Sequence, residues 1–208
     1  VEDAVRIGLP MALEQTASTG AQVVSTKIVA PLGTVAIAAN SFAVTAESIC
    51  YMPGYGIGSA ATAMVGQAIG AERKDLAKSF AWLTTFSGMV ITSITGSLMY
   101  FLCPYVFQFL TPDTAVQQLG VSVLRIELFA EPLFAASIVA SASLRGAKDT
   151  FVPGVMNLVS IWGVRISLAM ILTKSMGLYG VWTAMAIELS VRGILFLIRL
   201  KRGKWLEK

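Results

Sequence analysis

The sequence predicts an all-α integral membrane protein, built as a bundle of six transmembrane helices. Hydrophobic residues make up 55% of the 208 residues and charged residues only 13%, whereas a soluble domain typically carries about 25% charge. The apolar residues are gathered into long stretches, and a helix needs roughly 20 such residues to cross a bilayer. Turn-forming residues separate these stretches, and no soluble domain fits between them.

The first three apolar segments cover residues 9–30, 35–70 and 76–102. Pro31-Leu32-Gly33 closes the first segment and Cys103-Pro104 closes the third. The second segment is longer than a bilayer needs and contains Pro53, so it is either one helix bent there or two shorter elements that form a re-entrant or seventh span. We prefer the single bent helix, because membrane helices tolerate proline bends.

The last three segments cover residues 118–144, 151–173 and 178–200. A short amphipathic stretch (105–110) precedes them, and Thr111-Pro112-Asp113 is a typical helix start. The turn at residues 145–149 divides the fourth segment from the fifth. We therefore expect residues 1–208 to form a single membrane domain.

Basic residues are concentrated in alternate connections between the segments. The alternate connections on the other side hold only Lys174, with Lys27 near a helix end. The basic residues in question are Arg73, Lys74, Lys78, Arg145, Lys148, Arg199, Lys201, Arg202, Lys204 and Lys208. The positive-inside rule places these connections in the cytoplasm, so we expect a multi-pass protein of the plasma (inner) membrane with both termini cytoplasmic. The chain begins at Val1 with no signal peptide, which suggests part of a longer protein.

The composition also argues against enzymatic chemistry. The chain has no His, which removes imidazole metal ligands and Ser-His or Cys-His catalysis. Cys50 and Cys103 match no metal spacing or redox motif. We expect no enzyme activity, no bound metal, no cofactor and no nucleic-acid partner.

Two segments carry polar side chains on one helical face. At about 100° per residue, the polar residues of the first segment fall on less than half of its circumference, and a weaker cluster occurs on the second. The cavity-lining candidates among them are Gln15, Ser18, Gln22, Asn40 and Tyr51. A spanning helix cannot turn such a face to lipid. The two faces therefore line a polar cavity, or else they make interhelical hydrogen bonds without a cavity.

Ionisable residues inside the apolar segments are costly and need partners or water. Glu188 and Arg192 are spaced to pair along one helix. Arg165 has no such local partner, and counting residues from the segment ends places Glu131, Arg165 and Glu188 away from both interfaces. We predict Glu131–Arg165 as a cross-helix ion pair. For these four residues a structural role is an alternative to ligand contact, and Arg125 and Glu127 are expected to reach the outer interface.

Glu14 and Glu47 have no obvious basic partner in the sequence. Removing a carboxyl from water favours its neutral form, so each could hold a proton and release it on hydration. A Na⁺- or H⁺-coupled carrier needs this chemistry, and Glu14, Glu47 and Glu131 are our candidates for it. The alternatives are an interfacial carboxylate for Glu14 and a protonated, hydrogen-bonded core group for Glu47.

Several motifs resemble the C-terminal half of transporters of the multidrug and toxic compound extrusion (MATE) family, over nearly all of the chain. The matching stretches are Arg6-Ile7-Gly8-Leu9-Pro10, Pro31-Leu32-Gly33, Ala36-Ile37-Ala38-Ala39-Asn40, Pro53-Gly54, Val65-Gly66-Gln67-Ala68-Ile69-Gly70-Ala71, Leu144-Arg145-Gly146-Ala147-Lys148-Asp149-Thr150, Gly180-Val181-Trp182 and Gly203-Lys204-Trp205. The resemblance implies one lobe of a twelve-helix transporter, with two six-helix lobes around a central cavity.

The resemblance further implies export of organic, often cationic, compounds in exchange for Na⁺ or H⁺. Its partners would be membrane lipid, a small organic substrate and the other lobe. Some family members carry an acidic residue deeper in the helix that matches the first segment, where this sequence has Ser18, and an Asp near the position of Phe134. Glu14 and Glu131 lie about a turn from these places, so the other lobe is an alternative home for cation coupling.

Two other functions are considered. A flippase for lipid-linked saccharides of the same superfamily would need a cluster of cavity Arg or Lys side chains, and we expect cavity carboxylates at least to match the arginines here. A non-transporting membrane scaffold would tolerate Gln at Glu14 and Glu47. The leading hypothesis is the cation-coupled multidrug (xenobiotic) exporter.

Overall fold

The structure is a computed structural model that describes the backbone of residues 2–206 and the side chains of residue 8 and residues 12–206. It is helical almost throughout, with no strand among those residues. The elements are α1 (Glu2–Val29), η1 (Ala30–Leu32), α2 (Thr34–Gly70), α3 (Lys74–Leu110), α4 (Thr114–Leu128), α5 (Glu131–Gly146), α6 (Phe151–Leu158), η2 (Val159–Ile166), α7 (Ser167–Met176), α8 (Leu178–Arg202) and η3 (Lys204–Leu206).

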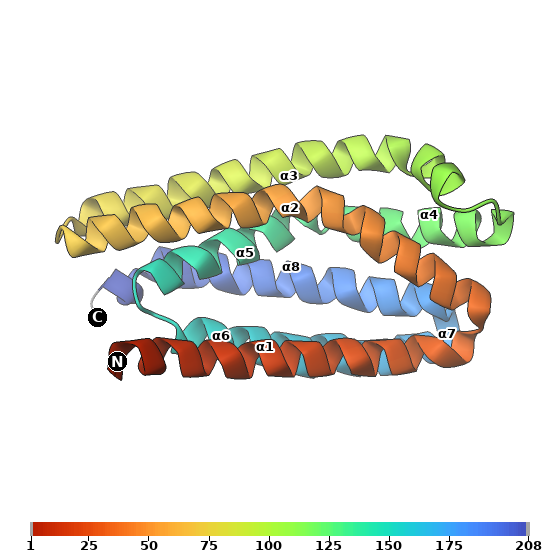
Figure 1. Cartoon of the computed structure of the whole chain (residues 1–208), viewed down its shortest axis with the longest axis horizontal. Coiled ribbons are helices and arrows are strands. Elements are labelled where there is room, and N and C mark those ends of the chain that lie inside the picture. The colour runs from red at the N-terminus through yellow and green to blue at the C-terminus, as the bar shows by residue number, and fades with distance from the viewer. Residues whose placement is uncertain (1, 207–208) are drawn as a thin grey trace.

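These elements make six passes, which confirms the predicted helical bundle. Within the described chain, four helical stretches are long and apolar enough to span a membrane: Thr34–Gly70, Lys74–Leu110, Phe151–Met176 and Leu178–Arg202. The other two passes are α1, which carries the polar face, and the α4–α5 pair. The passes run side by side, and α2 is a single helix that contains Pro53 and curves along its length (Figure 1).

The helices form layers (Figure 1). α1 lies against α6, η2 and α7, whereas α2 packs on α3, and α5 and α8 lie between these two groups. The α2–α3, α5–α6 and post-α8 connections share one end of the bundle with both chain termini (Figure 1). The basic residues of the predicted cytoplasmic connections are therefore gathered at that end, except that Lys208 lies outside the described residues.

The third helix does not end at residue 102 as predicted but continues to Leu110 with Pro104 inside it. Proline has no N–H and cannot bond the carbonyl of residue i−4, which here is Tyr100. The guanidinium of Arg125 on α4 occupies this place, because its Nε and Nη2 both donate to the Tyr100 carbonyl at 3.3 Å. Arg125 is thus a packing residue of the bundle rather than an interfacial one.

The fourth pass is broken, whereas the sequence predicted one helix over residues 118–144. α4 ends at Leu128, and α5 begins at Glu131 with Pro132 in its first turn. That position suits proline because the first N–H groups of a helix have no intrahelical partner. α4 begins at Thr114, before the predicted apolar span but at the helix start predicted from Thr111-Pro112-Asp113, and the Asp113 carboxylate accepts hydrogen bonds from the N–H groups of Ala115 and Val116.

The fifth pass contains a π-helix that the sequence did not predict. Residues Val159–Ile166 form this wider turn between α6 and α7 without interrupting the helix. π-Helical turns are rare and occur frequently at functional sites. Arg165 lies within this stretch.

Candidate functional site

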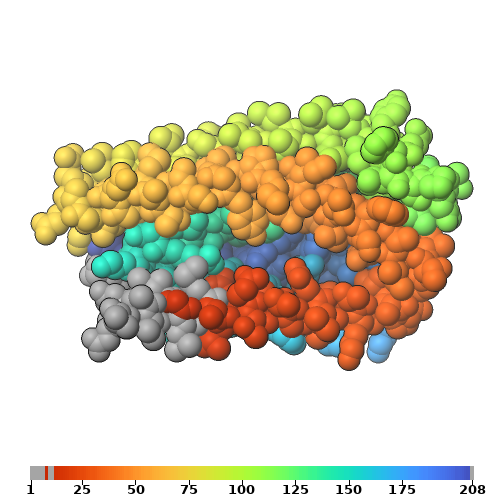
Figure 2. Space-filling view, in the orientation of Figure 1, coloured from red at the N-terminus to blue at the C-terminus, as the bar shows by residue number. Residues whose placement is uncertain are grey.

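A cavity of about 990 Å³ lies between α1 and α2. Figure 2 shows it as a hollow between these two helices, with α5 and α8 visible at its floor. All five predicted cavity-lining residues, Gln15, Ser18, Gln22, Asn40 and Tyr51, line it. The polar faces of α1 and α2 therefore face a hollow rather than closing on each other.

Glu14 stands at one end of the cavity and has a basic partner, contrary to the expectation from the sequence. Nη2 of Arg145 at the end of α5 lies 2.9 Å from Oε1 of Glu14. The amide of Asn157 on α6 donates to the same oxygen. Glu14 thus ties α1 to α5 and α6, and Arg145 is part of the cavity lining as well as a connection residue.

Glu188 and Arg192 form the ion pair that their spacing predicts, with 3.2 Å between Arg192 Nε and Glu188 Oε1. The same oxygen accepts a hydrogen bond of 2.7 Å from the Ser160 hydroxyl of η2. The guanidinium of Arg192 lies over the ring of Phe134, 5.7 Å from its centroid. This pair therefore joins α8 to η2 and to α5.

The predicted pair between Glu131 and Arg165 does not form. Both carboxylate oxygens of Glu131 are buried without a hydrogen-bond partner, and this side chain packs behind the cavity wall, against Gly96 of α3. A position away from both interfaces does not determine which way a side chain faces, and this explains the error.

Glu127 was wrongly expected at the outer interface. It is fully buried, and both of its oxygens lack a hydrogen-bond partner in the described structure. Because α4 begins at Thr114, Glu127 lies about 20 Å along the helix, at 1.5 Å per residue. The sequence contained the signal, because Asp113 is a good helix cap and was recognised as a helix start, but the expectation for Glu127 did not use it.

Three buried carboxylates, one each on α2, α4 and α5, act on one another electrostatically. Glu47 of α2 lines the cavity with only 6% of its surface exposed. Its charge acts on those of Glu127 and Glu131. The described His, Cys, Asp and Glu side chains contain no set of three close enough to hold one metal ion. Because a buried charge is costly unless it is neutralised or paired, each of these three carboxylates needs a proton or a counter-ion.

Arg165 lines the cavity from η2. Its Nη2 is 2.8 Å from the thioether sulfur of Met185, and no carboxylate of the described chain lies within ion-pair distance of it. Sulfur is only a weak acceptor. The charges that act on Arg165 from farther away are those of Glu188, Glu47, Arg192 and Glu127.

The described cavity lining has more arginines than carboxylates, which reverses the expectation from the sequence. Its basic residues are Arg145, Arg165 and Arg192, and its acidic residues are Glu14 and Glu47. Arg145 and Arg192 are paired, so Arg165 is the basic group of the lining that remains without an ion-pair partner in the described chain. A ligand in the cavity therefore meets positive as well as negative charge.

An aromatic surface adjoins these charges. The ring of Tyr51 meets those of Phe134 and Tyr55 edge to face, at centroid distances of 5.4 and 5.7 Å. The indole N–H of Trp182 donates to the side-chain oxygen of Asn40 at 3.0 Å. These rings offer apolar contact area to a flat ligand.

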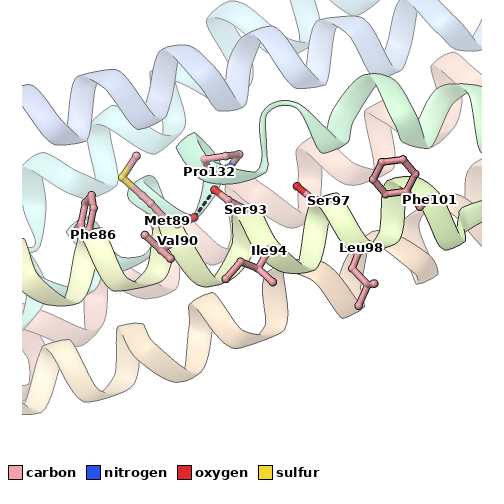
Figure 3. A pocket seen from close by; sticks show the side chains of 9 residues that line it. All are labelled: Phe86, Met89, Val90, Ser93, Ile94, Ser97, Leu98, Phe101 and Pro132. Atoms are coloured by element: carbon pink, nitrogen blue, oxygen red, sulfur yellow. Dashed lines mark hydrogen bonds between the residues drawn. The ribbon is translucent and has the colours of Figure 1, made fainter.

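A second hollow, of about 680 Å³, lies on the outer surface of α3. Figure 3 shows its lining, which is apolar except for Ser93 and Ser97 and comes from α3 and Pro132. The exposed rings of Phe86 and Phe101 lie along it. Such a surface suits lipid chains, and it carries none of the charged groups of the cavity.

The sequence profile of the MatE family matches residues 10–171. A probable multidrug resistance protein NorM of Brucella suis is 31% identical over 205 residues, covering 95% of this chain and 43% of the relative. The NorM of Mannheimia succiniciproducens is 27% identical and covers 94% and 43%. The chain thus spans less than half the length of these curated relatives.

Solved structures show the same fold. A MATE transporter in the bent conformation superposes with a TM-score of 0.89 at 20% identity, over 97% of this chain and 46% of that one. The Vibrio cholerae MATE transporter VcmN in its bent form gives 0.89 at 14% identity, over 96% and 45%. These relatives are transporters rather than enzymes. The chain belongs to the MatE family of multi-pass membrane transporters.

Proposed function

We propose that this chain is one lobe of a two-lobed multidrug efflux transporter, which exports organic, often cationic, compounds in exchange for Na⁺ or H⁺. The observation that carries the proposal is the polar cavity with Glu47 in its wall. The curated relatives are named probable multidrug resistance proteins and are more than twice as long. The second lobe would face the cavity and complete it.

Glu47 is the coupling residue in this proposal, with Glu131 and Glu127 behind it. Glu47 touches the cavity, whereas the other two carboxylates are enclosed. A buried carboxylate is stable only when it is protonated or paired. Entry of H⁺ or Na⁺ would neutralise Glu47, so that a cationic substrate leaves, and release of the ion would allow the next substrate to bind. Binding energy that differs between two conformations is what shifts their populations.

Glu14 remains a candidate for coupling through a different route. A cation arriving at Glu14 would compete with Arg145, its partner at 2.9 Å. The contact joins α1 to α5, so its loss would free one end of the cavity wall. The protein would lie in the plasma membrane, with the basic connections and both termini in the cytoplasm.

The test is dye export by the full-length transporter in proteoliposomes, under an imposed Na⁺ or pH gradient. We expect ethidium to be extruded under one of the gradients, and Glu47→Gln and Glu131→Gln to lower the initial rate at least tenfold. The matched control is Glu72→Gln, at an exposed carboxylate in the α2–α3 turn, which should keep the rate. Unchanged export in Glu47→Gln would reject this coupling site.

The second candidate is a flippase for lipid-linked saccharides. The lining supports it to the extent that arginines outnumber carboxylates, since a phosphate headgroup needs basic partners. In the same proteoliposomes, translocation of a fluorescent lipid-linked saccharide without ethidium export would select the flippase. If Glu14→Gln and Glu47→Gln leave both activities unchanged, a non-transporting scaffold is favoured.

A further inference from the structure

Arg165 faces the cavity from near the middle of its span, and the proposed coupling scheme does not use it. It lies 15 residues into the 26-residue stretch from Phe151 to Met176. A guanidinium stays charged under all physiological conditions. Placing such a charge away from both membrane surfaces is costly, and intramembrane charges generally have a role.

The neighbours of Arg165 leave its charge available. Its guanidinium donates to the Met185 sulfur, which is a weak acceptor. Oε1 of Glu188 is already shared by Arg192 and Ser160. Glu47 acts on Arg165 electrostatically but makes no ion pair with it. A guanidinium has five N–H donors and binds a carboxylate best through two parallel hydrogen bonds.

The local backbone supports a binding role. Arg165 is in the π-helical stretch, and the one-residue displacement in such a turn changes the direction in which the following side chains point. Glu47 and Tyr51 of α2 and Phe134 of α5 line the same cavity. The cavity therefore presents a cation, a carboxylate and an aromatic surface to one ligand.

We propose that Arg165 binds the acidic group of the transported compound, so that the preferred substrates are zwitterions: an aromatic body with an amine for Glu47 and a carboxylate for Arg165. The inference rests on the proposed function and narrows its substrate class. It agrees with exchange at Glu47, because the coupling ion displaces only the amine. The contact to Arg165 then supplies specificity.

The experiment uses two dyes that differ only in this acidic group. Rhodamine B is a zwitterion at neutral pH, and its methyl ester is a cation of nearly the same size. Binding of each dye to the purified full-length transporter is measured by fluorescence anisotropy, with empty micelles subtracted. A hydrogen bond to a charged group contributes about 1.5–3 kcal/mol, so we expect the zwitterion to bind roughly 10- to 100-fold more tightly than the ester.

Arg165→Gln should abolish this preference, because it weakens the binding of rhodamine B. The affinity for the ester should change less than about threefold. Arg165→Lys, which keeps the charge but not the planar fork, should retain part of the preference. Arg73→Gln is the control, because Arg73 is exposed in the α2–α3 turn. Binding of the ester by each variant shows that its cavity is intact.

Each outcome is informative. Equal binding of both dyes to the wild type overturns the inference and leaves the proposed function standing. A preference that persists in Arg165→Gln also overturns it, because another group must then hold the acid. Failure of the wild type to bind either dye counts against the cavity as a site for organic compounds, and hence against the proposed function itself.

Discussion

The role of Arg125 in the proline-containing helix α3 can be tested by a double-mutant cycle. Pro104 leaves the Tyr100 carbonyl without its helical donor, and Arg125 donates to it from Nε and Nη2 at 3.3 Å. The guanidinium also lies 4.8 Å from the centroid of the Tyr100 ring. Arg125→Met removes both interactions while keeping an unbranched apolar stem. Pro104→Ala supplies the missing N–H to Tyr100.

The expected magnitude follows from these contacts. Hydrogen bonds at 3.3 Å are slightly long, so we take the lower end for a charged donor, about 1.5 kcal/mol. A half-buried cation–π contact adds about 0.5–1 kcal/mol. Arg125→Met should therefore lower the free energy of unfolding by about 2 kcal/mol in the wild type. In the Pro104→Ala background the loss should be only about 0.5–1 kcal/mol, because the carbonyl keeps a donor.

The assay is reversible unfolding of the purified full-length transporter in mixed micelles, for the wild type, the two single variants and the double variant. Arg73→Met, at an exposed position, controls for the loss of one arginine. A finding that Arg125→Met lowers the free energy of unfolding equally in the wild type and in the Pro104→Ala background would refute the reasoning, because the guanidinium would then not replace the missing N–H.

Three further predictions concern the packing and the ends of the cavity. A Cβ at Gly193 of α8 would stand 2.3 Å from the Leu133 carbonyl oxygen of α5, so Gly193→Ala should lower the thermal midpoint by overpacking worth about 1–3 kcal/mol. In Gly56→Ala the added Cβ meets nothing within 4 Å, so the thermal midpoint should stay unchanged or rise. Equal changes of the midpoint in these two variants would contradict the close contact between Gly193 and the Leu133 carbonyl. Arg145→Gln should increase chemical labelling of a Cys placed at Ser18, because α1 loses its ion pair to α5, and unchanged labelling would mean that other contacts hold α1. Trp182→Phe removes the indole donor to Asn40 and should cost about 1 kcal/mol of stability; Asn40→Ala in the same background should then add little, and additive losses would argue against the bond.

The sequence predicted the six passes well because length and hydropathy are averaged over many residues. Each pass needs about 20 apolar residues, and local irregularities do not change that sum. The break between Leu128 and Glu131 was missed, although Pro132 was a signal for a helix start. The π-helix from Val159 to Ile166 has no comparable signal, because it depends on tertiary packing.

The site was predicted in part for a related reason. The polar faces of α1 and α2 depend on helical periodicity, which the sequence contains, and their residues line the cavity. Partners across helices depend on the rotation of each helix about its axis, which the sequence leaves open. The predicted Glu131–Arg165 pair therefore failed, and Arg145 was unforeseen as the partner of Glu14.

The π-helix has a consequence for the spacing of residues along the fifth pass. Such a turn is what one inserted residue produces in an α-helix that continues on both sides. Deleting one residue between Val159 and Arg165 would return the stretch to ordinary α-helical pitch. Residues before and after the deletion would then be rotated relative to each other by about 100°. The helix could then keep either Asn157 beside Glu14 or Arg165 in the cavity, but not both. The extra residue in the π-helical turn thus allows Asn157 and Arg165, eight residues apart, to line the same cavity.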